Sequence, residues 1–159
     1  MKKVYFLFVI LFCFSIISCV SLKDATVVKN DNPKDFKYFI VNSTDTLNSS
    51  TGGMINGVYY STGKSVNPKD IISGYLIKKG FIILTEKNDE LLNQTLIVNY
   101  GESGRREVLF GYTTEVTIQF LNAKTKEIVC VTTAEGIGDT EADDIKKAIT
   151  RALDAVFIE

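Results

Sequence analysis

The sequence of 159 residues contains no histidine and no tryptophan, and it has only three cysteines and two prolines. Histidine is the commonest general base and metal ligand in proteins, so its absence excludes Ser-His-Asp and Cys-His catalysis and most zinc sites. Cys13 and Cys19 lie close to the start, which leaves Cys130 alone in the rest of the chain. Cys130 stands in an apolar run, so we expect a small buried side chain and no disulfide within the domain.

Long hydrophobic runs are also missing, apart from the segment Val4–Ile17 that follows Lys2 and Lys3. Its roughly 14 residues fall short of the roughly 20 that a membrane-spanning helix needs. The residues Ile-Ile-Ser-Cys that end at Cys19 resemble a bacterial lipobox. We therefore predict a signal peptide over 1–18, cleavage between Ser18 and Cys19, and acyl chains on Cys19 that anchor the protein to a membrane.

The residue after the cysteine is Val20, and not the aspartate that retains some lipoproteins at an inner membrane. We therefore expect an outer-membrane protein of the cell envelope that faces the periplasm. Removal of the signal peptide leaves 141 residues (159 − 18), with 16 basic and 19 acidic side chains and a net charge of −3. That sign argues against nucleic acid or anionic lipid headgroups as the main partner.

The predicted mature chain divides into two segments. Residues 19–36 are polar with scattered hydrophobic residues, which is typical of a flexible tether that carries the lipidated cysteine. Residues 37–159 have the length of a single globular domain. Its first strand is Tyr38–Val41, which has apolar residues on both faces.

The stretch Asn42–Gly53 is rich in Ser, Thr and Gly, so it is predicted to be a surface loop. Within it, Asp-Thr-Leu around Thr46 resembles an acceptor site for O-glycosylation in some bacteria. Residues 54–60 then indicate a short strand or hairpin arm. Its paired tyrosines, Tyr59 and Tyr60, face either a partner or the core, and the sequence leaves both open.

The first predicted helix begins at Asn67-Pro68, where asparagine caps and proline suits the first turn, and ends at Gly80. Strands are predicted over residues 81–84 and 95–100. The next stretch, residues 101–106, is predicted to be a Gly-rich loop that holds Arg105 and Arg106. Two adjacent arginines could bind a carboxylate or phosphate of a partner, or they could be ordinary solvent-exposed loop charges.

The last part of the chain has the clearest periodicity. Strict alternation over Thr114–Leu121 predicts a half-exposed strand, which a hairpin turn joins to a partner strand over residues 127–134. A helix capped by Asp139 or Thr140 then runs to about Phe157. The acidic residues around its start fit the positive end of the helix macrodipole and do not complete a calcium loop, so no metal site is expected: Glu135, Asp139, Glu141, Asp143 and Asp144.

This order of elements predicts an α+β two-layer sandwich, with two main helices on one face of a mixed, mostly antiparallel sheet of about five strands. It resembles the anticodon-binding-domain-like lipoproteins of the bacterial envelope, which include penicillin-binding-protein activator lipoproteins and the amino-terminal domain of the Tol-system propeller protein. The resemblance lies in residues 71–80, 116–121, 124–129 and 136–139 and in the helix over 142–157. A tryptophan common in that group is absent, and Cys130 falls near its place.

The resemblance implies a tethered module that binds another envelope protein and carries no catalytic residues or cofactor. We therefore predict a non-catalytic, lipid-anchored protein-binding or assembly module. One alternative is a small-ligand carrier, which requires a common cavity lined by tyrosines: Tyr59, Tyr60, Tyr75, Tyr100 and Tyr112. The other is a carboxylate-based envelope hydrolase, which requires two carboxylates that converge in a pocket.

Overall fold

A computed structural model describes residues 21–108 and 111–158. The predicted signal peptide, its cleavage site at Ser18 and the predicted lipidation site at Cys19 lie outside the described residues. Within the described ranges, no helix combines the length and hydrophobicity that a membrane crossing requires.

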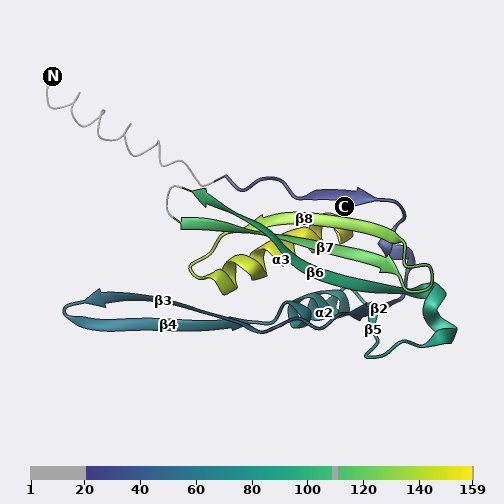
Figure 1. The fold of residues 1–159 in the computed structure, drawn as a ribbon, viewed down its shortest axis with the longest axis horizontal. Helices are drawn as coiled ribbons and strands as arrows, with labels where there is room; N and C mark the ends of the chain where they lie inside the picture. The colour runs from purple at the N-terminus through teal and green to yellow at the C-terminus, as the bar shows by residue number, and fades with distance from the viewer. Residues whose placement is uncertain (1–20, 109–110, 159) are drawn as a thin grey trace, which may run out of the picture.

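The centre of the fold is a six-stranded mixed sheet (Figure 1). Its strands, in spatial order, are β1 (Thr26–Lys29), β8 (Ile128–Gly136), β7 (Gly111–Asn122), β6 (Thr95–Val108), β2 (Tyr38–Val41) and β5 (Ile82–Ile83). From β1 to β6 all neighbours are antiparallel, whereas β2 runs parallel to both β6 and β5. The expected α+β class and the mostly antiparallel sheet are confirmed.

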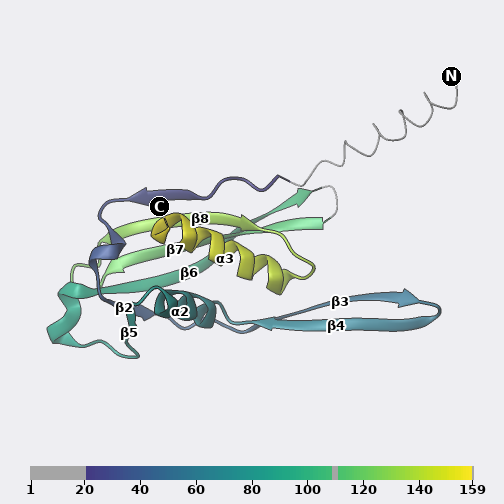
Figure 2. The same cartoon turned by 180° about the vertical axis from the view of Figure 1, so that it is seen from behind.

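Two helices, α2 (Pro68–Lys78) and α3 (Glu141–Phe157), cover one face of this sheet (Figure 2). Asn67 caps α2 as predicted, because its side chain accepts a hydrogen bond from the backbone N–H of Lys69. Gly80 follows at φ +91°, a conformation that favours glycine and turns the chain back toward the sheet. Thr140 caps α3, and acidic residues fill the first turn of α3 as expected.

The core lies between the helices and the sheet. Val116, Ile118 and Phe120 of β7 are fully buried and point toward the helices. Phe157, near the end of α3, joins an aromatic cluster with four other rings, which are those of Phe39, Tyr75, Phe81 and Phe120. Cys130 is also fully buried, as predicted, and burial raises the pKa of its thiol.

The structure corrects the second half of the predicted tether. Residues Thr26–Lys29 form β1, which pairs antiparallel with β8, and a short 3-10 helix, η1 (Pro33–Asp35), follows it. Phe36, the last residue of the predicted tether, is buried in the core. These residues therefore belong to the domain, because the outer edge of β8 offers its unpaired backbone groups to β1.

Two further segments expected to be loops are strands. The predicted surface loop over 42–53 contains β3 (Leu47–Ile55), which pairs with β4 (Val58–Val66) in a separate two-stranded sheet. The predicted loop over 101–106 is part of β6, whose pairing with β7 continues past a bulge between Glu102 and Gly104. Ser103 is the extra residue at this bulge, and both glycines remain paired with β7 on either side of it.

Candidate functional site

One face of the sheet is covered by no helix in the part of the chain that the structure describes. Since successive side chains of a strand point to opposite faces, the burial of Val116, Ile118 and Phe120 against the helices directs Thr117, Gln119 and Leu121 to the other side. In Figure 1 the strands pass in front of α3, and in Figure 2 the helices lie in front of the strands. We call the uncovered side the open face.

The open face carries no charge over the three rows of cross-strand neighbours that lie nearest the β7–β8 turn, whereas the next row contains Glu115 and Glu135. Strand register gives the rows Ile97–Leu121–Ile128, Asn99–Gln119–Val131–Val28 and Gly101–Thr117–Thr133–Thr26. Nearly a quarter of the residues in the whole chain, 23%, are charged, so three uncharged rows are a marked local departure. Val28 is 65% and Ile128 is 41% exposed. Uncharged, half-apolar surface of this kind is typical of protein–protein contact areas.

A second exposed feature is the β3–β4 hairpin, which we call the arm. It extends away from the sheet and helices (Figures 1 and 2). Its turn is Asn56-Gly57, with φ angles of 51° and 78°, which matches the two-residue hairpin turns that favour Asn-Gly. No charged residue occurs from Leu47 to Gly63.

The base of the arm is attached to the start of α3. Lys64 pairs with Asp143 at 2.6 Å. The Ser49 hydroxyl accepts a hydrogen bond from the backbone N–H of Ala142 at 3.0 Å, and the Thr51 hydroxyl donates to the Asp139 carbonyl at 2.7 Å. These polar contacts hold the base, whereas the outer part of the arm has no such contact among the described residues.

The predicted contact residues Tyr59 and Tyr60 lie in the outer part of the arm. Met54, Val58, Tyr59 and Tyr60 are 73%, 53%, 67% and 59% exposed, respectively. Met54 is the cross-strand neighbour of Tyr59 on one side of the arm, and the Tyr59 ring lies over Gly52, where an added Cβ would collide with it. The sequence left open whether these tyrosines face a partner or the core, and their exposure shows that they do not belong to the core.

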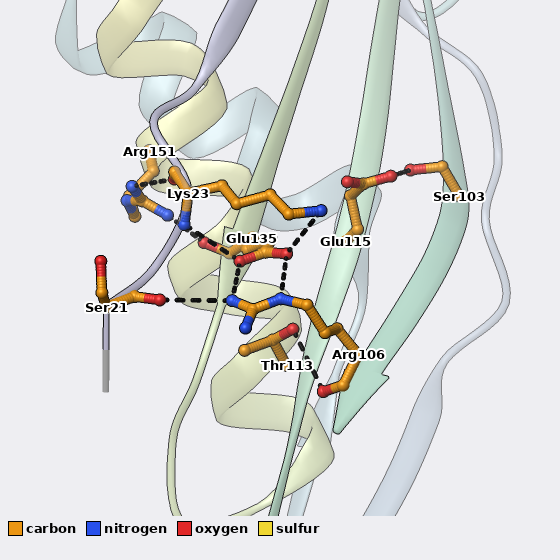
Figure 3. Close-up of polar contacts among 8 residues, drawn as sticks. All are labelled: Ser21, Lys23, Ser103, Arg106, Thr113, Glu115, Glu135 and Arg151. Atoms are coloured by element: carbon orange, nitrogen blue, oxygen red, sulfur yellow. Dashed lines mark hydrogen bonds and ion pairs between the residues drawn. The ribbon is translucent and has the colours of Figure 1, made fainter. Parts of the chain in front are cut away.

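Arg105 and Arg106, the other predicted contact residues, are on β6 and point to opposite faces. Arg105 forms an ion pair with Glu141 at the start of α3. The guanidinium of Arg106 donates two hydrogen bonds to the carboxylate of Glu135 on β8, at 2.9 and 2.6 Å (Figure 3). Both arginines are therefore engaged within the molecule, and they do not form a joint anion-binding pair.

Glu135 is only 2% exposed and connects the start of the described chain to the sheet. Its carboxylate also accepts a hydrogen bond from the backbone N–H of Lys23 at 3.1 Å, and the Lys23 ammonium lies 3.6 Å away. Arg106 donates to the Ser21 carbonyl at 3.3 Å, and Arg151 of α3 donates to the Lys23 carbonyl at 2.8 Å. We call this group, formed by Ser21, Lys23, Arg106, Glu135 and Arg151, the Glu135 clasp (Figure 3).

The clasp keeps Glu135 ionised despite its burial. Hydrogen bonds from Arg106 are the main cause that lowers the pKa of Glu135 to about 2, while burial acts in the opposite direction. Sequence reasoning assigned Glu135 to the group at the helix start and missed this role. The available signal was an acidic residue near the end of a strand that carries no other charge, since such a residue needs a partner when it is buried.

A polar cleft of about 490 Å³ lies where the arm base, the β6–β7 end and the start of α3 meet. It brings together three of the acidic residues, Asp139, Glu141 and Asp144, and the carboxylates of the last two have structural partners. Glu141 pairs with Arg105, and Asp144 accepts a hydrogen bond from the Gly138 backbone N–H. Burial is the main cause that raises the pKa of Asp144. Among the described residues, no group of His, Cys, Asp and Glu is placed to hold a metal ion.

The five tyrosines of the ligand-carrier hypothesis lie on four different elements. Tyr59 and Tyr60 are on the arm and Tyr112 is an exposed residue of β7. Tyr75 of α2 donates to Asp154 at 2.8 Å, and Tyr100 of β6 contacts Glu102. The predicted glycosylation site Thr46 is exposed just before β3, where its hydroxyl accepts a hydrogen bond from Asn67 at 3.3 Å.

Comparison with known proteins gives no family assignment, because no protein-family model and no curated protein sequence matches the chain. Two similar solved structures are dodecamers of PelC from Paraburkholderia phytofirmans. A point variant is 10% identical over 86% of this chain and 99% of that chain, with a TM-score of 0.48. The other structure is 15% identical over 84% of this chain and 97% of that chain, with a TM-score of 0.44. At these values the likeness assigns no function to the present chain.

Proposed function

We propose that this chain is a lipid-anchored protein of the bacterial cell envelope that acts, without catalysis, as a protein-binding or assembly module. The lipobox-like sequence before Cys19 supports the anchor, and the outer membrane is the proposed location. The observation that carries the binding role is the open face, with three uncharged rows in a chain of ordinary charge content.

The composition of the open face favours a protein partner. Burial of the half-exposed Val and Leu side chains against a partner would stabilise the complex, because it removes apolar surface from water. The neighbouring Thr, Gln and Asn side chains can form hydrogen bonds that fix the orientation of the partner. Thr117 and Thr133 hydrogen-bond to each other at 3.1 Å, which leaves further acceptor capacity for a partner. The absence of charge in the three rows also lowers the desolvation cost of burial.

Site-specific photocrosslinking in intact cells tests this proposal. We expect a crosslinkable residue at Gln119, in the middle of the open face, to give one dominant protein adduct. The same residue at Lys146, on the exposed side of α3, serves as the matched control and should give none. Equal adducts from both positions, or none from Gln119, would contradict the binding role.

The anchor is tested separately. We expect Cys19→Ala to remove the protein from the membrane fraction, and we expect mass spectrometry of the mature wild-type chain to show acylation at Cys19. A mature chain that begins upstream of Cys19, or that lacks acyl groups, would refute the lipidation.

A further inference from the structure

The first described residues of the chain are bound firmly to the sheet. Arg106 donates to the carbonyl of Ser21, and both the backbone N–H and the carbonyl of Lys23 are hydrogen-bonded within the clasp. The carboxylate at the centre of this group is almost fully buried. The chain is therefore fixed to the domain from its first described residue onward.

This attachment limits the distance between the domain and the anchor of the proposed function, on which the present inference rests. Two residue steps separate Cys19 from Ser21, and they span at most about 7 Å when extended. Acyl chains on Cys19 would lie in the membrane, so the clasped end of the domain would lie close to the headgroups. The body cannot swing freely on a long tether.

The tip of the arm lies toward this same end of the molecule. In Figures 1 and 2, Ser21 begins the coloured chain on the side to which the arm extends. Strand topology agrees, because β6 ends and β7 begins beside the clasp, whereas the β7–β8 turn is at the opposite end. The arm tip and the anchor therefore face in the same direction along the molecule.

The chemistry of the tip suits a membrane surface. The exposed large hydrophobic side chains described at the tip are two tyrosines, a methionine and a valine, and no charged residue occurs from Leu47 to Gly63. Tyrosine is enriched at membrane–water interfaces, where its ring enters the apolar zone and its hydroxyl stays hydrated. An uncharged strand pair also avoids the cost of bringing charges into that zone.

We propose that the arm tip, formed by Met54, Val58, Tyr59 and Tyr60, is a second membrane-contact site that enters the headgroup region of the bilayer holding the Cys19 anchor. The Glu135 clasp fixes the domain so that the tip meets this bilayer. The occupant is a phospholipid surface, and the open face is left available to a protein partner.

Tryptophan fluorescence tests the site cleanly, because the chain contains no tryptophan. The lipidated protein is reconstituted into phosphatidylcholine vesicles with and without bromine-labelled acyl chains. We expect Tyr59→Trp to show a blue shift and loss of emission in bromolipid. The matched control is Ile128→Trp, at an exposed position beside the β7–β8 turn, which should show neither change.

A longer tether tests the role of the clasp without altering the fold. A Gly-Ser spacer of about six residues, inserted between Val20 and Ser21, adds about 20 Å of reach. We expect it to weaken the quenching of Tyr59→Trp, because the tip is no longer forced against the bilayer. Quenching that is unchanged by the spacer would overturn the orienting role of the clasp.

The outcomes separate this site from the proposed function. If the Tyr59→Trp protein floats with the vesicles but bromolipid does not quench its emission, the anchor is supported and the membrane-contact site is refuted. The tip would then be a candidate contact for a protein partner. If the purified chain carries no acyl group and does not float, the proposed anchor itself fails.

Discussion

The body of β7, β8 and α3 and the arm of β3 and β4 are built on opposite principles. In the body, alternate side chains of the strands and one stripe of α3 are buried in a common core. In the arm, exposure extends over nearly the whole length, and Val66 at the base is the buried one among the side chains that the structure describes there. Hydrophobic burial stabilises the body, whereas the arm consists of two strands that would be marginal alone. The body therefore holds the fold together and also presents the open face, whereas the arm adds exposed side chains and little stability.

The largest effect is expected in the body. Phe157→Ala removes a ring that contacts four other aromatic rings, so we expect a loss of about 3–5 kcal/mol in unfolding free energy. Denaturant unfolding of the non-lipidated Cys19→Ala chain measures it. A loss below about 1 kcal/mol would show that the aromatic cluster is not the centre of the core.

The second effect concerns the clasp and depends on pH. The pKa of Glu135 is lowered to about 2 from an ordinary 4.5, so its stabilisation is present above about pH 4.5 and is lost as pH falls toward 2. We expect Glu135→Gln to be less stable than wild type at pH 7 and to lose less stability on acidification. Thermal unfolding at pH 7 and pH 3 measures this.

Glu127→Gln, in the exposed β7–β8 turn, is the matched control for the clasp and should follow the wild-type pH profile. A Glu135→Gln profile parallel to wild type would mean that the clasp contributes nothing to folding.

A smaller effect is expected at the joint between arm and body. Asn67 caps α2 directly after β4, and its side-chain oxygen also accepts a hydrogen bond from the Thr44 hydroxyl at 2.8 Å. We expect Asn67→Ala to cost about 1 kcal/mol in unfolding free energy. Asn48→Ala, an exposed change in the arm, is the comparison and should cost much less.

The smallest effect is expected in the arm itself. Tyr60→Ser replaces an exposed side chain that no buried neighbour supports, so we expect a change in stability within about 0.5 kcal/mol. The same variant should reduce vesicle contact in the lipidated protein. A large loss of stability would contradict the separation of arm and body.

The two regions also differ in how far the sequence predicted them. Alternation over Thr114–Leu121 and helical spacing over residues 142–157 identified β7, α3 and their core residues correctly, because burial imposes a period on the sequence. β3 has no apolar period, since both of its sides face solvent over most of its length. Its Ser, Thr and Gly content therefore predicted a loop, although Asn56-Gly57 was a usable hairpin signal.

Long-range contacts explain the other errors. β1 forms because β8 offers it a free edge to pair with. The sequence of residues 26–29 does not show that such an edge is available. The clasp joins Lys23, Arg106 and Glu135, which are far apart in the sequence, so neither its geometry nor the engagement of Arg106 follows from composition or spacing. For Tyr59 and Tyr60 the sequence left a partner-facing and a core position open, and the exposure of both side chains decides against the core.

A shortened arm gives the most direct test of the claim that the arm contacts the membrane while the body stabilises the fold. Deletion of residues 52–55 and 58–61 keeps Asn56-Gly57 as a two-residue turn between the paired Thr51 and Thr62, and it retains the contacts of the arm base with α3. We predict that the shortened, lipidated protein unfolds at nearly the wild-type temperature and still floats with vesicles. A nitroxide label on the turn of the full-length arm should be immersed in the bilayer, whereas the same label on the shortened arm should not. Loss of the native fold, or equal immersion of both labels, would contradict the account.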